Sequence, residues 1–223
     1  MTTLTERYSG AVDFARLAHH GGVRKGTSIP YLSHVLAVSA LVLEYGGDED
    51  QAIVALLHDV AEDAGGEKRL DEISVKFGAG VGRIVRACSD SLAEDRAHKD
   101  PWWVRKVRYL AHLEAADEQV LLVSAADKVH NVEATVADYG AEGEELWSRF
   151  NADSGRGGQL WYQREVARVL CSGLTDGPAR LLAARLATAV EALHDLVKES
   201  VGAETVVQDR QWAEKHAASH RLR

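Results

Sequence analysis

The sequence is poor in residues that hold a protein together covalently or interrupt helices. Its two cysteines, Cys88 and Cys171, are far apart and form no CxxC motif. We therefore expect both thiols to be reduced, in a protein that needs no disulfide. There are only three prolines in 223 residues. The first residues, MTTLTERYSG, have no signal-peptide character.

Long apolar runs are also missing. The longest, from Val35 to Leu43, is about half of a membrane span and contains Ser39. The sequence thus predicts a soluble cytoplasmic protein with no membrane partner. Apolar residues make up 46% of the chain, which is enough to bury a substantial core without covalent cross-links.

Positive charge is in deficit, with 26 Lys and Arg against 34 Asp and Glu, and the formal net charge is -8. Binding duplex nucleic acid irrespective of sequence needs a broad basic face, so this composition argues against a nucleic-acid partner. A small anionic ligand is still compatible with it. A metal ion and a few local cations can reverse the potential inside a cleft.

Alanine, leucine, arginine and glutamate dominate stretches with helical spacing, and no convincing alternating strand occurs. The sequence therefore predicts an all-α, single-domain helical bundle of about eight to ten helices. Asp48 is the expected N-cap of one of them. The predicted helices cover residues 4–20, 30–45, 49–64, 70–77, 81–91, 102–113, 118–136, 142–150, 160–170 and 178–198.

The segment VALLHDVAED, residues 54–63, is an apolar helix that ends in four ionisable residues. His58 and Glu62 are spaced i,i+4, as are Asp59 and Asp63, so the four groups crowd one helix end. Burying so many ionisable groups is costly unless a cation or a reaction uses them. The alternative is an exposed helix end with solvated acids.

Two other segments have a similar character. VLLVSAADKVHN, residues 120–131, is apolar until Asp127, and Asn131 lies one turn further on the same face. His34 interrupts the apolar run of IPYLSHVLAV. Taken singly, Asp127 reads equally well as a surface acid, and a lone histidine is more often a satisfied core residue than a ligand.

As an ordered set, these residues resemble the ligand pattern of the HD superfamily of phosphohydrolases: a His, then a His-Asp pair, then a distant Asp. The matching residues are His34, His58, Asp59 and Asp127. Two imidazoles and two carboxylates suit a divalent transition ion and leave coordination positions for water and substrate.

The resemblance extends to the hydrolase domain of the RelA/SpoT homologues and is closest in size to the single-domain small alarmone hydrolases. It rests on ARLAHHGGVRKGTSIPYLSH, ALLHDVAED, FG at 77–78 and AADKVHN, and covers about residues 8–135. It implies an all-helical HD fold and a Mn²⁺ ion held by the four ligands, although another divalent transition ion would also fit. The implied reaction uses metal-activated water to remove the 3′-pyrophosphate of a guanosine alarmone.

The same resemblance implies roles for five more residues. Glu62 and Asp63 are the implied catalytic pair, since carboxylates beside the ion could orient water and move protons. Arg24 and Lys25 would lie beside the base and ribose, where a planar guanidinium can stack on a purine. Asn131 is the implied asparagine that follows the last metal ligand.

Beyond these, Lys106 is our candidate for binding a 5′-diphosphate, although a salt-bridged surface helix is an equally good interpretation of its segment. Ser124 stands where many family members have a lysine, which leaves the exact nucleotide open. Two alternatives therefore stay in view. One is an HD nucleotidase or phosphatase acting on other nucleoside phosphates or NADPH. The other is a nucleotide sensor or antitoxin-like partner that retains the fold.

The expected domain organisation is an HD domain over residues 1–175, a C-terminal helix over 176–200, and a polar tail over 201–223 that is open to partial disorder. The C-terminal helix carries an apolar stripe. It would pack either on the domain or in a homo-oligomer interface. The stripe consists of Leu182, Leu186, Val190, Leu193 and Val197.

Overall fold

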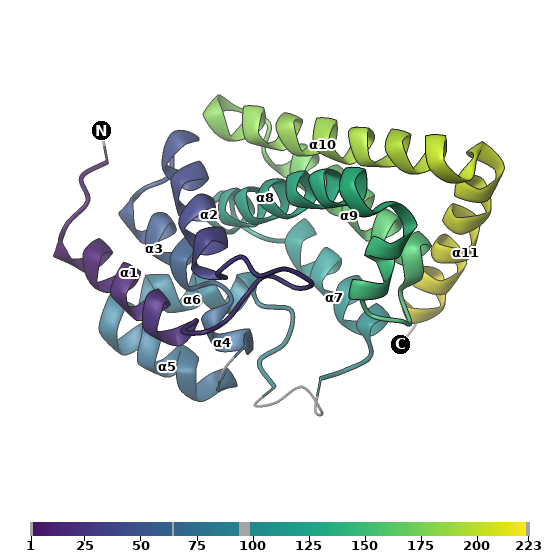
Figure 1. Ribbon diagram of the computed structural model, residues 1–223. Coiled ribbons are helices and arrows are strands. Elements are labelled where there is room, and N and C mark those ends of the chain that lie inside the picture. The colour runs from purple at the N-terminus through teal and green to yellow at the C-terminus, as the bar shows by residue number, and fades with distance from the viewer. Residues whose placement is uncertain (1, 64, 94–98, 222–223) are drawn as a thin grey trace.

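The computed structural model describes residues 2–63, 65–93 and 99–221, without the side chain of Asp63. These residues form α-helices, one 3-10 helix and no strand, apart from a single isolated bridge between Val23 and Pro30. The predicted all-α class is confirmed. Figure 1 shows α10 lying across one side of the molecule, over α8 and α9.

Within its described residues, the first half of the chain contains six helices, several of them short. They are α1 (Glu6–Ala18), α2 (Leu32–Glu44), α3 (Glu49–Leu57), α4 (Val60–Asp63), α5 (Gly66–Phe77) and α6 (Ala79–Cys88). The second half contains the longer helices. They are α7 (Trp102–Glu114), α8 (Glu118–Glu142), the 3-10 helix η2 (Gly143–Arg149), α9 (Gly155–Gly173), α10 (Gly177–Val201) and α11 (Ala203–Arg221).

Helix α3 is the centre of the N-terminal half. Residues 51–57 are all buried, and the helix packs against α1, α2, α6 and α8. Asp48 caps the start of α3, as the sequence predicts, and Gln51 completes a capping box: the Asp48 carboxylate accepts from the Gln51 amide N–H at 2.9 Å, and the Gln51 side chain accepts from the Asp48 N–H at 3.0 Å. Because α3 is capped at its start and buried along its length, the residues that follow Leu57 have a fixed position.

The helix predicted over 49–64 is divided into α3 and α4, which is a correction to the sequence interpretation. The chain leaves the helix at His58 and Asp59 and resumes at Val60. The hydrophobic period continues through the break, since Val60 and Ala61 are buried like the residues before it. A pattern that counts only apolar spacing cannot detect such a turn. The helix predicted over 142–150 is likewise a 3-10 helix, and α8 is six residues longer than predicted.

The apolar stripe of α10 is buried within the protein, where the helix packs along α8 and α9. The polar segment after Val201 is a helix, α11, where the sequence interpretation left room for disorder. Two alanines, Ala213 and Ala217, are buried where α11 meets α7 and α9. Small side chains allow this close approach, so a helix with little apolar surface can still dock. Trp212 adds an edge-on contact with Trp103, with ring centroids 5.7 Å apart.

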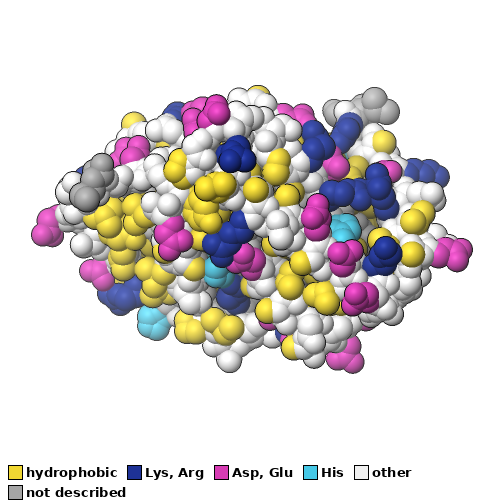
Figure 2. Space-filling view, turned by 90° about the horizontal axis from the view of Figure 1, so that it is seen from above, with side chains coloured by type: hydrophobic (Ala, Val, Ile, Leu, Met, Phe, Trp, Pro, Cys, Tyr) yellow, Lys and Arg dark blue, Asp and Glu magenta, His cyan; other side chains and the backbone are white. Residues whose placement is uncertain are grey.

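None of the helices in the described ranges is long and apolar enough to span a bilayer. Figure 2 views the molecule from above Figure 1, on the side of α10. Acidic, basic and hydrophobic side chains are interspersed over this face.

Replacing Leu182 by alanine should destabilise the protein by about 2–5 kcal/mol, because this side chain is fully buried and the change leaves a cavity. The adjacent Leu181 is 53% exposed and provides a matched control, for which Leu181→Ala should change the free energy of unfolding by less than about 0.5 kcal/mol. Urea unfolding of the two variants measures the difference. Equal losses would contradict the orientation of α10.

Candidate metal centre and active site

Four side chains from three separate parts of the chain converge at one buried point. His34 comes from α2, His58 and Asp59 from the turn after α3, and Asp127 from α8. The His34 Nε2 atom lies 3.2 Å from Asp127 Oδ1 and 3.8 Å from Asp59 Oδ2. The His58 Nε2 atom lies 3.1 Å from Asp59 Oδ2 and 3.5 Å from Asp127 Oδ1. The structure therefore brings together the four residues that the sequence selected.

The hydrogen bonds of the two imidazoles indicate which ring nitrogens carry protons. His58 Nδ1 lies 2.9 Å from the Ala55 carbonyl, which can only accept, so Nδ1 is the donor. Arg24 must donate to His130 Nδ1 at 2.9 Å. That nitrogen is therefore an acceptor, and His34 Nδ1, 3.0 Å away, donates to it as well. In neutral rings, both Nε2 atoms consequently carry lone pairs.

These two lone pairs are directed at the carboxylates, and neither Nε2 atom has a hydrogen-bond partner although both are buried. An arrangement of two unpartnered lone pairs and two anionic oxygens is costly by itself. A divalent cation would remove that cost by accepting all four groups. The donor set of two nitrogens and two oxygens suits a divalent transition ion.

Further side chains orient the two carboxylates. The Tyr31 hydroxyl donates to Asp59 Oδ2. Asn131 Nδ2 donates to Asp127 Oδ1, and Lys128 Nζ pairs with Asp127 Oδ2, each at 2.6 Å. Such partners fix the direction of a ligating group and tune its basicity. The side-chain amide of Asn131 thus hydrogen-bonds to Asp127, which it can reach because it lies one helical turn further along α8.

Glu62 lies on α4, just after the turn formed by His58 and Asp59, and its side chain is 21% exposed. Its Oε1 lies 3.1 Å from Lys99 Nζ, and its Oε2 accepts from the Asp90 N–H at 3.3 Å. Burial, together with the charges of Asp90 and Asp59, raises the pKa of Glu62 to about 7. A carboxyl with this pKa can hold or release a proton near neutral pH. The predicted partner Asp63 has its side chain outside the described part of the chain.

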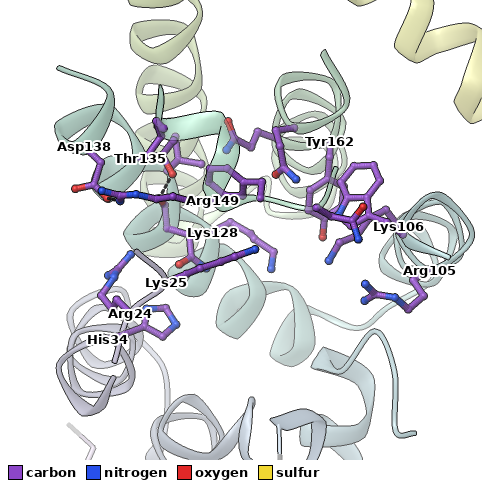
Figure 3. Close-up of a pocket in the computed structure, with 18 of the residues that line it drawn as sticks. Arg24, Lys25, His34, Arg105, Lys106, Lys128, Thr135, Asp138, Arg149 and Tyr162 are labelled. Carbon is purple, nitrogen blue, oxygen red and sulfur yellow. Dashed lines mark hydrogen bonds and ion pairs between the residues drawn. The ribbon is translucent and has the colours of Figure 1, made fainter. Parts of the chain in front are cut away.

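A pocket of about 460 Å³ opens next to the cluster, with His34 in its wall. Figure 3 shows basic side chains reaching into it from opposite sides. Its lining contains one carboxylate, Asp138, against six cations: Arg24, Lys25, Arg105, Lys106, Lys128 and Arg149. In a chain with a net charge of -8, this concentrates positive potential at one place. The volume lies in the range of small-molecule sites.

A second hollow, of about 870 Å³, lies next to the first. It shares lining residues that include Lys25, Tyr31 and Arg105 with the first, and it adds Glu62 and Lys99. The two hollows are therefore contiguous. A ligand with two separated anionic groups could occupy both and pass close to the His-Asp cluster.

The structure places Arg24, Lys25, Lys106 and Asn131 in the wall of the first pocket. Sequence reasoning missed the contacts made by Tyr31, Lys128, His130, Asp90 and Arg149. Three of these could have been predicted from their places in the sequence. Tyr31 lies one turn before His34, Lys128 follows Asp127 directly, and His130 lies three residues after Asp127. Arg149 arrives from the distant 3-10 helix, and its place in the sequence gives no such indication.

Comparison with known proteins agrees with this geometry. The HD domain family matches residues 11–155. The chain belongs to the HD domain family. HD domains bind divalent metals, and His34, His58 and Asp59 form a group that could hold one.

Curated relatives of this HD protein include two that are much longer. "GTP pyrophosphokinase rsh" of Brucella ovis is 33% identical over 113 residues, which are 51% of this chain and 15% of that protein. "Guanosine-3′,5′-bis(diphosphate) 3′-pyrophosphohydrolase" of Aquifex aeolicus is 30% identical over 127 residues, or 57% of this chain and 17% of that protein. The chain thus spans less than a fifth of either relative.

A solved structure supports the fold over a larger part of the HD protein. It is described as a metazoan ortholog of SpoT that hydrolyzes ppGpp. It superimposes with a TM-score of 0.62 at 21% identity, over 83% of this chain and 96% of that one. At this identity the likeness establishes a shared fold.

The raised pKa of Glu62 makes a prediction about stability. A carboxyl whose pKa rises from 4.5 to about 7 on folding binds its proton more tightly in the native state. It therefore lowers the free energy of unfolding as pH rises between these values. In metal-free protein, Glu62→Gln should remove this loss. The variant should gain up to about 3 kcal/mol relative to wild type between pH 4.5 and 8.

Urea unfolding of both proteins over this pH range measures the effect. Glu67→Gln, at an exposed acid on α5, is the control and should not change the pH dependence in this direction. A constant difference between wild type and Glu62→Gln would show that Glu62 titrates normally.

Proposed function

We propose that this HD protein is a metal-dependent (p)ppGpp 3′-pyrophosphohydrolase that releases pyrophosphate from guanosine alarmones. The observation that carries the proposal is the position of the His-Asp cluster. His34 lines a cation-lined pocket of nucleotide size, and Glu62 lies close enough to Asp59 that, besides burial, the Asp59 charge raises its pKa. The names of the relatives support the same substrate class.

In this proposal His34, His58, Asp59 and Asp127 hold a divalent ion, for which Mn²⁺ is our candidate. When bound, such an ion polarises phosphoryl oxygens and lowers the pKa of water. The hydrogen bonds to Ala55 and His130 keep both Nε2 lone pairs available for it.

Glu62, whose pKa is raised to about 7 in the metal-free protein, is the proposed proton carrier. Ionised, it can accept a proton from the attacking water. Protonated, it can return one to the leaving 3′ oxygen. Asp63 is its proposed partner in orienting the water, and Lys99, 3.1 Å from Glu62, would face the departing pyrophosphate.

Arg24 and Lys25 are proposed to hold the nucleoside. The bond to His130 fixes one edge of the Arg24 guanidinium and leaves its planar face for a purine. Asn131 lies in the same wall and acts on the metal side through Asp127. Lys106 and its neighbour Arg105 are proposed to meet the 5′-phosphates, because each keeps N–H donors beyond those that pair with Asp90.

The direct test is incubation with Mn²⁺ and ppGpp or pppGpp, followed by separation of the products. We expect equimolar pyrophosphate with GDP or GTP. Glu62→Gln should lower kcat by about 10²–10⁴-fold, and Asp59→Ala should abolish turnover. Glu67→Gln is the matched control and should retain wild-type activity.

Other products would redirect the assignment. Inorganic phosphate released from several nucleotides or NADPH would identify a broader phosphatase. Tight nucleotide binding without turnover would point to a sensor or an antitoxin-like partner.

His130 provides a test of the metal site that does not depend on turnover. His130→Phe removes the acceptor of the His34 Nδ1–H, so His34 loses its fixed orientation and tautomer. Loss of such a partner typically weakens metal binding by about 10–100-fold, which calorimetric titration with Mn²⁺ can measure. His112→Phe changes an exposed histidine on α7 and should bind Mn²⁺ like wild type. Unchanged affinity in both variants would show that His130 does not orient His34.

A further inference from the structure

Asp90 is a buried carboxylate that belongs to none of the predicted site residues. It lies two residues after the end of α6, and its side chain is only 6% exposed. Each carboxylate oxygen pairs with a different cation at 2.5 Å, Oδ1 with Arg105 Nη1 and Oδ2 with Lys106 Nζ. Burial acts to raise the pKa of Asp90, but Lys106 and Arg105 outweigh it and lower this pKa below its ordinary value. Asp90 is therefore a fixed negative charge.

The two cations that Asp90 holds are consecutive residues of α7 and would ordinarily point about 100° apart around the helix. Pairing with one carboxylate draws both toward the same wall of the 460 Å³ pocket. Lys106 is further restrained, because its Nζ lies 4.8 Å from the centre of the Tyr162 ring. Figure 3 shows Arg105, Lys106 and Tyr162 together on one side of the pocket.

Holding two long side chains in place before a ligand arrives lowers the entropy that binding has to remove. It also leaves both cations able to bind anions. A lysine has three N–H donors and an arginine has five. Lys106 uses one on Asp90, and Arg105 uses one there and a second on the Asp100 carbonyl at 3.1 Å. The remaining donors can reach phosphate oxygens.

The backbone of Asp90 makes a different contact from its side chain. Its N–H donates to Glu62 Oε2 at 3.3 Å. One residue thus touches the proposed proton carrier through its main chain and the proposed phosphate-binding cations through its carboxylate. A side-chain substitution at position 90 can therefore affect the second contact and leave the donor of the first in place.

We propose that Asp90 is a positioning residue that holds Arg105 and Lys106 ready for the 5′-diphosphate of the nucleotide. This inference rests on the proposed function and identifies what arranges its phosphate subsite. Asp90 itself touches no reacting atom. Its carboxylate contributes to substrate affinity, and its charge also helps to set the pKa of Glu62 and with it the pH at which the chemical step is fastest.

The test measures binding of GDP, which carries the 5′-diphosphate without a 3′ group, together with steady-state hydrolysis of ppGpp. Asp90→Asn should raise the Kd of GDP and the KM of ppGpp about tenfold. Because the charge of Asp90 also helps to raise the pKa of Glu62, kcat is compared at the pH optimum of each protein, where it should change less than threefold. A residue that merely stabilised the fold would not produce this split. Asp209→Asn is the matched control, since Asp209 pairs with Arg156 at 2.6 Å outside the pocket. It should change Kd and KM less than twofold.

A double variant shows whether Asp90 acts through Lys106. In a Lys106→Gln background, Asp90→Asn should raise the Kd of GDP by less than threefold, because only one of the two cations that Asp90 positions, Arg105, is still present. If Asp90→Asn does not fold, Asp90→Glu takes its place. Asp90→Glu keeps the negative charge but displaces the carboxylate, so it should raise the Kd of GDP at least threefold. In the Lys106→Gln background this increase should be smaller.

Equal GDP affinity in wild type and Asp90→Asn would overturn the inference, as would full additivity of the Asp90 and Lys106 substitutions. If wild type binds GDP but releases no pyrophosphate from ppGpp, the proposed function fails while the binding data still decide the role of Asp90. If wild type binds no GDP but releases pyrophosphate from ppGpp, the inference about Asp90 fails while the proposed function stands.

Discussion

The buried meeting of two imidazole lone pairs with two carboxylates is the constraint on which the rest of the structure depends. Such a group is costly in a protein interior unless protons on the imidazoles or a metal ion offset the two negative charges. Holding it requires rigid supports, and the chain supplies them from three elements: α2, the turn after α3, and α8. The dense packing of α3, with its capped start, fixes the position of His58 and Asp59. The hydrogen bonds to Ala55 and His130 then fix the rotation of each ring.

A second level of organisation is electrostatic. The chain is acidic as a whole, yet the wall beside the cluster carries six cations. Several of these are paired with carboxylates, as Lys106 is with Asp90 and Arg149 with Asp138 and Glu142. Paired cations can be buried at lower cost than isolated ones, and they retain donors for a ligand. This is how an acidic protein can present a strongly basic interior surface.

Much of this was readable in the sequence. The helical class followed from composition and spacing. His34, His58, Asp59 and Asp127 were selected because, as an ordered set, they resemble the ligand pattern of the HD superfamily. What the sequence could not reveal depends on chain geometry. The break between α3 and α4 does not interrupt the spacing of apolar residues, since the residues on both sides of it are buried. Arg149 and Asp90 reach the site from a 3-10 helix and a loop, where no periodicity predicts direction. Helix α11 looked too polar to pack, and it docks through two alanines and an aromatic contact.

The boundary of the family match has a consequence for how selectivity can change. The match ends at residue 155, but the pocket wall continues into α9 with Gln159, Tyr162 and Gln163. Helix α11 in turn supports Trp103, beside the pocket residue Trp102. The metal cluster thus lies wholly within the shared segment, whereas part of the pocket wall comes from outside it. Substitutions in α9 and α11 could reshape the choice of nucleotide and leave the hydrolytic centre untouched.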